Sequence, residues 1–293
     1  MRARLALLAT AFLFSTGGAA VKACGLGAWQ VAGLRSTFAV VALLVALPSA
    51  RTRWTPAIFA VGCAQAATMM LFVTATKLTT AANAIFLQCT APLYLLVLGP
   101  LVLREPVRRS DVVFLAPFAL GLATIFFGDA PPSATAPDPH LGNWLATASG
   151  VSWALVVIGF RWTAREGTAL GATLLAGNVI VALVGLSLGL PIVGATGTDW
   201  AIVAFLGVFQ IGLAYGLLSI GMRDVPALEA SLVMLIEPAL NPVWAWLVHG
   251  ERAGPATLVG GGIILAATAT KTLVDWRGVS ARVVDRAPGA EAG

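Results

Sequence analysis

Two apolar stretches of this sequence, each with a proline near its middle, restrict the fold most. The first runs from Thr79 to Glu105 around Pro92, and the second from Val225 to Glu251 around Pro238. Their prolines and closing glutamates share one register, because 238 − 92 and 251 − 105 both equal 146. Each stretch holds about 22 apolar residues, which as a helix measures about 33 Å and crosses the hydrocarbon core of a bilayer. We therefore expect two membrane-spanning helices that descend from one duplicated unit.

A proline at mid-membrane depth frees a backbone carbonyl. Since proline has no N–H, the carbonyls of Gln88 and Met234, four residues before Pro92 and Pro238, lose their helical partners. In lipid, such groups are tolerated only where protein or a water-filled cavity satisfies them. Both proline helices should therefore face the protein interior.

The rest of the chain is equally apolar, with 58% hydrophobic and 11% charged residues, which excludes a soluble core. The apolar character of the first segment continues through Val21, so we interpret it as a helix rather than a secretory signal peptide. The sequence predicts an all-α integral membrane protein with ten spans, at 5–21, 29–47, 56–76, 81–103, 111–128, 143–161, 170–190, 200–221, 227–248 and 256–275.

The basic residues predict the orientation. With a cytoplasmic N-terminus, 14 arginines and lysines lie on the inner side and three, Lys22, Lys77 and Arg252, on the outer side. This bias predicts that both termini are cytoplasmic. Residues 131–142 would then be an extracytoplasmic linker and 276–293 a disordered cytoplasmic tail, since both are polar and rich in Pro, Gly or Ala.

Five spans on each side of the linker make the second half enter the membrane in the opposite sense from the first. We therefore expect two inverted five-helix repeats, residues 1–130 and 143–275. In such an architecture the substrate site lies near the midplane at the repeat interface, in broken or kinked helices.

Several stretches resemble a known family. IGLAYGLLSIGMRDVPALEASLVMLIEPALNPVWAWLVHGE, followed by LVGGGIILAATA, is similar to the closing half of an EamA domain of the drug/metabolite transporter superfamily. The first proline stretch, with LRSTFAVVALL ahead of it, resembles the same domain again. Two departures stand out, because the first helix carries Phe14–Ser15–Thr16–Gly17 instead of a tryptophan–glycine start, and Ala91 replaces the glutamate before the proline.

The resemblance implies a ten-helix carrier with alternating access, without a cofactor, in the bacterial inner membrane. Since the family includes exporters of amino acids, the resemblance favours export of amino acids or related small metabolites by this chain. Efflux of drugs or cations and transport of sugar phosphates remain alternatives on the same fold.

Polar residues at mid-depth are the candidate site. Glu237 lies directly before Pro238, where the apolar surroundings favour its neutral form, so proton coupling, an amine partner and a structural role at the kink are all open. Met234, Glu237, Asn241 and Trp244 form one helical stripe, which is the best candidate for a cavity lining. The other cavity candidates are Gln88, Pro92, Tyr94, Trp153, Tyr215 and Pro238.

Three cations near the outer face need partners. Arg35 lies inside the second span, where a substrate carboxylate, Glu237 or backbone carbonyls could each bind it. Lys22 and Lys77 are expected to extend toward the lipid headgroups, with a role in gating an anionic substrate as the alternative. Glu105 is expected to pair with Arg104 or Arg108, and Glu251 with Arg252.

Other functions are poorly supported. A nucleotide-binding GxxxxGK[ST] motif, a Gly-x-Ser-x-Gly elbow and a metal-binding histidine pattern are missing from the sequence, so an integral-membrane enzyme is a remote alternative and we predict no metal. The dispersed basic residues argue against a nucleic-acid partner. The glycines at 260–262 predict close helix packing, either within one chain or across a homodimer seam.

Overall fold

The computed structural model describes residues 1–103, 109–128, 131–165 and 170–285, and within them the chain is helical apart from turns and one isolated β-bridge between Ser133 and Ala136. The elements of the first half are α1 (Arg2–Ser15), α2 (Gly17–Ala23), α3 (Ala28–Ala46), η1 (Pro48–Arg51), α4 (Pro56–Leu78), α5 (Ala81–Gln88), α6 (Ala91–Leu103) and α7 (Arg109–Phe126). Those of the second half are α8 (Pro139–Arg165), α9 (Leu170–Gly189), α10 (Gly197–Phe205), η2 (Leu206–Leu213), α11 (Ala214–Asp224), α12 (Ala227–Met234), α13 (Ile236–His249) and α14 (Pro255–Asp285).

The ten expected spans match these elements. Within the described residues, nine segments are long and apolar enough to cross a membrane, and Val112–Phe126 is a shorter apolar helix at the place of the fifth span. The predicted all-α membrane fold is therefore confirmed. The expected disordered tail is wrong over its first part, because α14 continues past the membrane segment to Asp285.

Among the described residues, four spans are interrupted and are not regular α-helices. The fourth span breaks into α5 and α6 at Cys89 and Thr90, and the ninth into α12 and α13 at Leu235, each just before the proline that predicted a kink. The first span breaks at Thr16, and the eighth contains the π-helical segment η2 between α10 and α11. These last two interruptions contain no proline, so the sequence did not indicate them.

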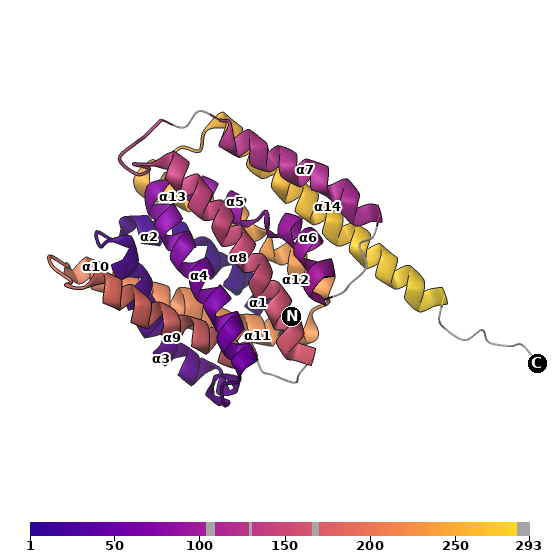
Figure 1. Cartoon of the computed structure of the whole chain (residues 1–293), viewed down its shortest axis with the longest axis horizontal. Coiled ribbons are helices and arrows are strands. Elements are labelled where there is room, and N and C mark those ends of the chain that lie inside the picture. The colour runs from indigo at the N-terminus through magenta and orange to yellow at the C-terminus, as the bar shows by residue number, and fades with distance from the viewer. Residues whose placement is uncertain (104–108, 129–130, 166–169, 286–293) are drawn as a thin grey trace, which may run out of the picture.

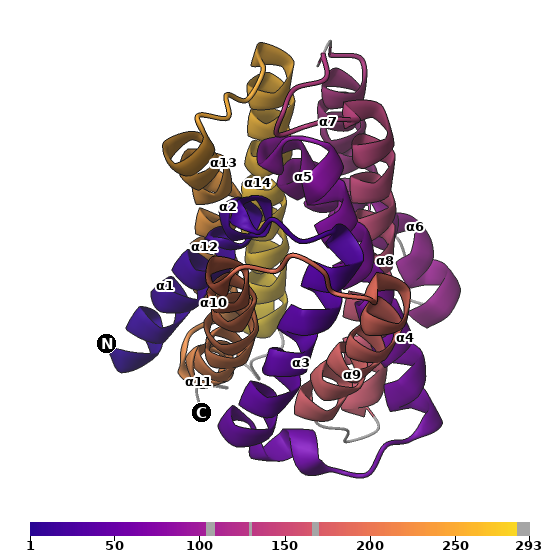
Figure 2. The same ribbon diagram turned by 90° about the vertical axis from the view of Figure 1, so that its left-hand side faces the viewer.

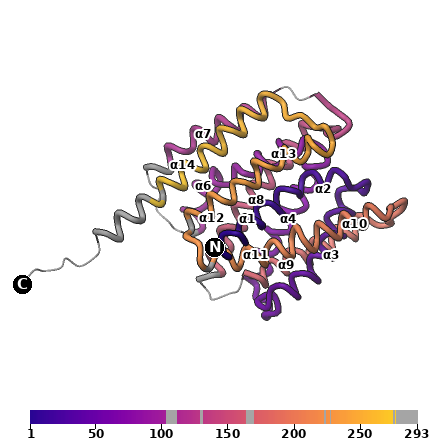
Figure 3. Tube along the Cα trace, turned by 180° about the vertical axis from the view of Figure 1, so that it is seen from behind, coloured from indigo at the N-terminus to yellow at the C-terminus, as the bar shows by residue number. Residues whose placement is uncertain are grey.

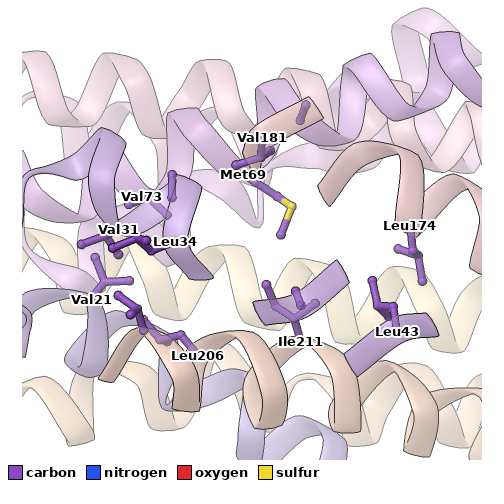
Figure 4. Close-up of a cluster of buried hydrophobic side chains, with 14 of the residues drawn as sticks. Val21, Val31, Leu34, Leu43, Met69, Val73, Leu174, Val181, Leu206 and Ile211 are labelled. Atoms are coloured by element: carbon purple, nitrogen blue, oxygen red, sulfur yellow. The ribbon is translucent and has the colours of Figure 1, made fainter. Parts of the chain in front are cut away.

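Small residues bring the helices of the two halves together. A Cβ on Gly33 of α3 would lie 2.7 Å from the backbone N of Leu186 in α9, and one on Gly185 would lie 2.7 Å from the N of Gly33. This close contact lets Val31, Leu34 and Leu43 of α3 share one buried cluster with Leu174 and Val181 of α9, in which Leu43 lies beside Leu174 (Figure 4). The core thus crosses the boundary between the two sequence halves.

The helices α7 and α14 lie side by side along one edge of the bundle (Figure 1). Gly121 and Gly260 allow this approach, because a Cβ on Gly260 would lie 2.6 Å from the carbonyl oxygen of Gly121. Gly261 packs against the ring of Phe86 in α5, whereas a Cβ on Gly262 would meet nothing within 4 Å. Two of the three glycines therefore serve packing within one chain.

The packing partners of the two halves correspond. The helix α8, which opens the second half, packs on α4, α5 and α6 of the first half. Correspondingly, α1 opens the first half and packs on α11, α12 and α13 of the second. Such an exchange is what a duplicated unit would produce, and the inversion of the second repeat stays a prediction.

The two ends of the bundle are formed by different segments. The turn between α13 and α14 and the segment 131–138 lie at one end, called the linker end (Figure 2). The start of α1 lies toward the opposite end, called the terminal end, as the trace in Figure 3 also shows. The basic residues predict that the linker end is extracytoplasmic.

Candidate functional site

The break in the fourth span faces protein, as the proline predicted. Gly150 of α8 lies against it, and a Cβ there would be 3.2 Å from the carbonyl oxygen of Gln88. The Gln88 side chain donates from Nε2 to Oγ of Ser149 at 2.6 Å, and Ser149 donates in turn to the carbonyl of Thr68 at 3.1 Å. The freed backbone at this break is thus covered by α8 and not by lipid.

Charged and polar side chains from both halves gather around Tyr215, which follows the π-helical segment on α11. Glu237 of α13, Arg35 of α3 and the side chain of Gln65 of α4 all lie close enough to its hydroxyl group to interact with it electrostatically. Tyr215 and Glu237 are half-buried, whereas Arg35 and Gln65 are buried. The fold therefore places a cation, a carboxyl group and two neutral polar groups in one region inside the membrane.

Several buried polar atoms in this region have no hydrogen-bond partner. They include Nε of Arg35, Oε1 of Gln65 and Oε1 of Gln210, which belongs to the π-helical segment. An unpaired polar atom inside a protein costs about 1–3 kcal/mol, and more when the group is charged. Such unmet groups inside membrane-spanning helices are available to a bound polar molecule or to water.

The outer part of the predicted stripe on α13 packs against the break in the first span. Asn241 is buried, and a Cβ on Gly18 of α2 would lie 2.5 Å from its Oδ1 atom. Trp244 donates from Nε1 to Oγ of Ser15 at 2.9 Å, and its ring meets Phe12 edge-on at 5.4 Å between centroids. Asn241 and Trp244 thus hold the α1–α2 junction, while Glu237 lies near Tyr215.

The remaining candidates are spread along the interior. Pro92 and Tyr94 lie half-buried on α6, Met234 ends α12, and Pro238 is buried on α13. Trp153 of α8 meets Phe160 of the same helix edge-on at 6.5 Å between ring centroids. The structure thus places Glu237 and Arg35 within electrostatic range of Tyr215, whereas these other candidates lie along α6, α8, α12 and α13.

An apolar groove of about 270 Å³ opens beside the α1–α2 junction. It is lined by Thr16, Ala19, Ala20, Ala23, Ile202, Trp244 and Val248. Its lining comes from both halves of the chain but carries no charge, so it is unlike the region around Tyr215.

The two lysines near the linker end do not extend to the headgroups. The ammonium group of Lys22 lies 2.9 Å from Oε2 of Glu251, and each of these side chains is 4% exposed. Lys77 donates to the backbone carbonyl of Cys24. The expectation of headgroup contacts was wrong because carbonyls and a carboxylate of the protein itself satisfy these ammonium groups. The expected pair of Glu251 with Arg252 was wrong for the same reason, whereas Glu105, Arg104 and Arg108 lie outside the described residues.

A second polar cluster lies beside this pair and joins α5, α8 and α14. Asn83 donates from Nδ2 to Oδ1 of Asn143 at 3.1 Å and accepts at Oδ1 from the hydroxyl of Thr257 at 2.6 Å. Thr79 donates to the same oxygen of Asn143 at 2.8 Å. The sequence showed these residues only as polar positions near helix ends. Within the described part of the chain, no group of three or more His, Cys, Asp or Glu residues is placed to hold a metal ion.

Comparisons with known proteins identify the family. The model of the EamA-like transporter family matches residues 1–127 and 140–271. The threonine/homoserine exporter RhtA of Escherichia coli strain K12 is 29% identical over 136 residues, which are 45% of each chain, and the same protein of strain O157:H7 matches equally. The match therefore spans less than half of the length of these relatives. A solved structure described only as "Crystal structure of protein" has a TM-score of 0.62 at 22% identity, over 94% of this chain and 98% of that one, and shows the same fold.

Proposed function

Since the chain belongs to the EamA-like transporter family, we propose that this multi-pass membrane protein exports amino acids or related small metabolites across the bacterial inner membrane by alternating access. The curated relative that exports threonine and homoserine supports an amino-acid substrate. The observation that carries the proposal is the polar region around Tyr215. It lies deep in an apolar bundle and is built from both halves.

The charges of this region suit a zwitterion. Arg35 is 4% exposed and its Nε atom has no hydrogen-bond partner, which is costly for a cation inside a membrane span. A substrate carboxylate would pair with this guanidinium group through charge-assisted hydrogen bonds. Glu237, which also lies within electrostatic range of Tyr215, would accept the ammonium group of the same substrate or of a cationic one.

The interrupted helices beside this region provide positions at which the bundle can bend. The break between α12 and α13 lies directly before Glu237, and the π-helical segment lies directly before Tyr215. Interrupted helices of this kind bend at their breaks, and π-bulges are frequent at functional sites. Alternating access would then move α13 and α11 against α3 and α4, which carry Arg35 and Gln65.

The test is a counterflow experiment in proteoliposomes with threonine, a mixture of other amino acids, choline and sugar phosphates. We expect labelled amino acids to exchange in the wild type and exchange to be lost in both Arg35→Gln and Glu237→Gln. A cation exporter would instead exchange choline and keep that activity in Arg35→Gln. The exposed Arg4→Gln is the matched control for loss of a cation and should exchange normally.

The same vesicles test proton coupling. If Glu237 carries the proton, an imposed pH gradient drives transport in the wild type but not in Glu237→Gln. An unchanged response to the gradient would exclude this role while leaving the substrate role in place. If no solute exchanges in folded wild-type protein, the proposal of a carrier is wrong.

A further inference from the structure

The buried ion pair at the linker end joins segments from both halves of the chain. Lys22 ends the first span on α2, and Glu251 follows α13 in the second half. Besides its contact with Glu251, the ammonium group donates to the carbonyl of Thr79 at 2.8 Å and to the carbonyl of Thr135 in the linker. Glu251 accepts at Oε1 from the backbone N–H of Ala81 at 2.7 Å. One pair of side chains thus ties four segments together.

These contacts lie on both sides of the boundary that a rocking motion must open. Lys22, Thr79 and Ala81 belong to the first half, whereas Glu251 belongs to the second. If the halves move apart at the linker end, the Lys22–Glu251 contact and the Ala81–Glu251 hydrogen bond must both break. The ion pair can therefore exist only while this end is closed.

A buried ion pair is suited to a reversible contact. Its desolvation offsets much of its attraction, so it adds little net stability when formed, while either charge left alone in the same place is strongly unfavourable. Parting of the two halves would return water to both charges at once. The pair therefore favours two states, one closed and dry and one open and hydrated, over states between them.

We propose that Lys22 and Glu251 form the latch that closes the linker end of the transport pathway and must separate each time this end opens. The inference rests on the proposed alternating access, but not on the identity of the substrate. A static clamp is the competing interpretation, and in that case the pair would stay closed throughout the cycle.

Cys24 provides a native reporter of this gate. It lies two residues from Lys22, is 1% exposed, and accepts at its backbone carbonyl from Lys77. Its neighbour Gly25 donates from its N–H to Asp199 at 2.6 Å, which ties the same turn to α10. Opening of the linker end would expose the thiol. Because Cys63 is exposed and Cys89 is half-buried, the experiment uses a Cys63→Ala/Cys89→Ala background.

In this background, a membrane-impermeant maleimide is applied to whole cells and to inverted vesicles, so that both orientations are covered. We expect Cys24 to react about tenfold faster in Lys22→Gln and in Glu251→Gln than in the parent, from the side that the linker end faces, because the closed population falls. The charge-swapped variant Lys22→Glu/Glu251→Lys should return to slow labelling. Arg4→Gln, which breaks the ion pair at the terminal end, is the matched control and should label at the parental rate.

Unchanged labelling in both single variants, or equal acceleration in Arg4→Gln, would overturn the proposal. If the single variants do not fold, a second experiment decides. Lys22→Cys/Glu251→Cys, made without the three native cysteines, is joined by a short cleavable thiol cross-linker and reconstituted. We expect solute exchange to stop and to return after reduction, whereas full exchange by the cross-linked protein would show that the pair need not part.

Discussion

The two ends of the bundle are each held by an ion pair between the halves, but the two pairs differ in surroundings. At the linker end, Lys22 and Glu251 are each 4% exposed and are surrounded by further backbone contacts. At the terminal end, Nε of Arg4 lies 2.6 Å from Oε1 of Glu229, and these side chains are 65% and 35% exposed. The same kind of contact should therefore have unequal effects, because water screens one pair and is excluded from the other.

The largest expected effect follows removal of Glu251. Glu251→Ala leaves the Lys22 ammonium group buried without its counter-ion and the Ala81 N–H without its acceptor, so we expect the free energy of unfolding to fall by about 3–5 kcal/mol. Unfolding by denaturant in detergent micelles measures this change. The double variant Lys22→Met/Glu251→Ala should recover most of the loss, since no buried charge remains. A loss below about 1 kcal/mol in the single variant would mean that the pair is hydrated.

A smaller effect is expected at the α1–α2 junction. A Cβ at Gly18 would lie 2.5 Å from Oδ1 of Asn241, so Gly18→Ala should lower the free energy of unfolding by about 1–3 kcal/mol. At Gly216 of α11 the nearest atom, Cβ of Ala46, is 3.5 Å away, so Gly216→Ala is the matched control and should be neutral or slightly stabilising. Combining Gly18→Ala with Asn241→Ala should restore much of the loss. Additive losses in this double-mutant cycle would contradict the contact.

The smallest effect is expected at the terminal end. Arg4→Gln removes an exposed pair, so the free energy of unfolding should change by less than about 1 kcal/mol, and the difference should shrink further at high salt. The same unfolding experiment at low and high ionic strength checks both points. A loss as large as that of Glu251→Ala would show that the two ends are equivalent, and the comparison would fail.

Local signals of the sequence predicted the breaks in the two proline helices but not the other two interruptions. Proline removes a backbone donor wherever it occurs, so the breaks beside Pro92 and Pro238 depend on sequence position alone. The break at Thr16 and the π-helical segment around Gln210 contain no proline. They occur where Gly17 and Gly18 meet the side chains of Gln210 and Asn241, which are distant in sequence.

The candidate site shows the same division. Glu237 and Arg35 were evident as isolated charges in apolar spans, because any such charge needs a partner in lipid. Their common position near Tyr215 depends on how α3, α11 and α13 pack, which no local pattern records. Lys22 was the clearest failure of sequence reasoning, since a lysine at a helix end usually reaches water, and its partner Glu251 lies in the other half of the chain.

The sequence by itself thus determined the membrane class, the ten spans, the two proline breaks and the likeness of the two halves. Each of these depends on the length, polarity or backbone chemistry of a short segment. Only the tertiary structure decided which polar groups meet, because partners in this bundle come from distant helices brought together by close glycine contacts. It thereby placed Glu237 near Tyr215 and closed the linker end with Lys22 and Glu251.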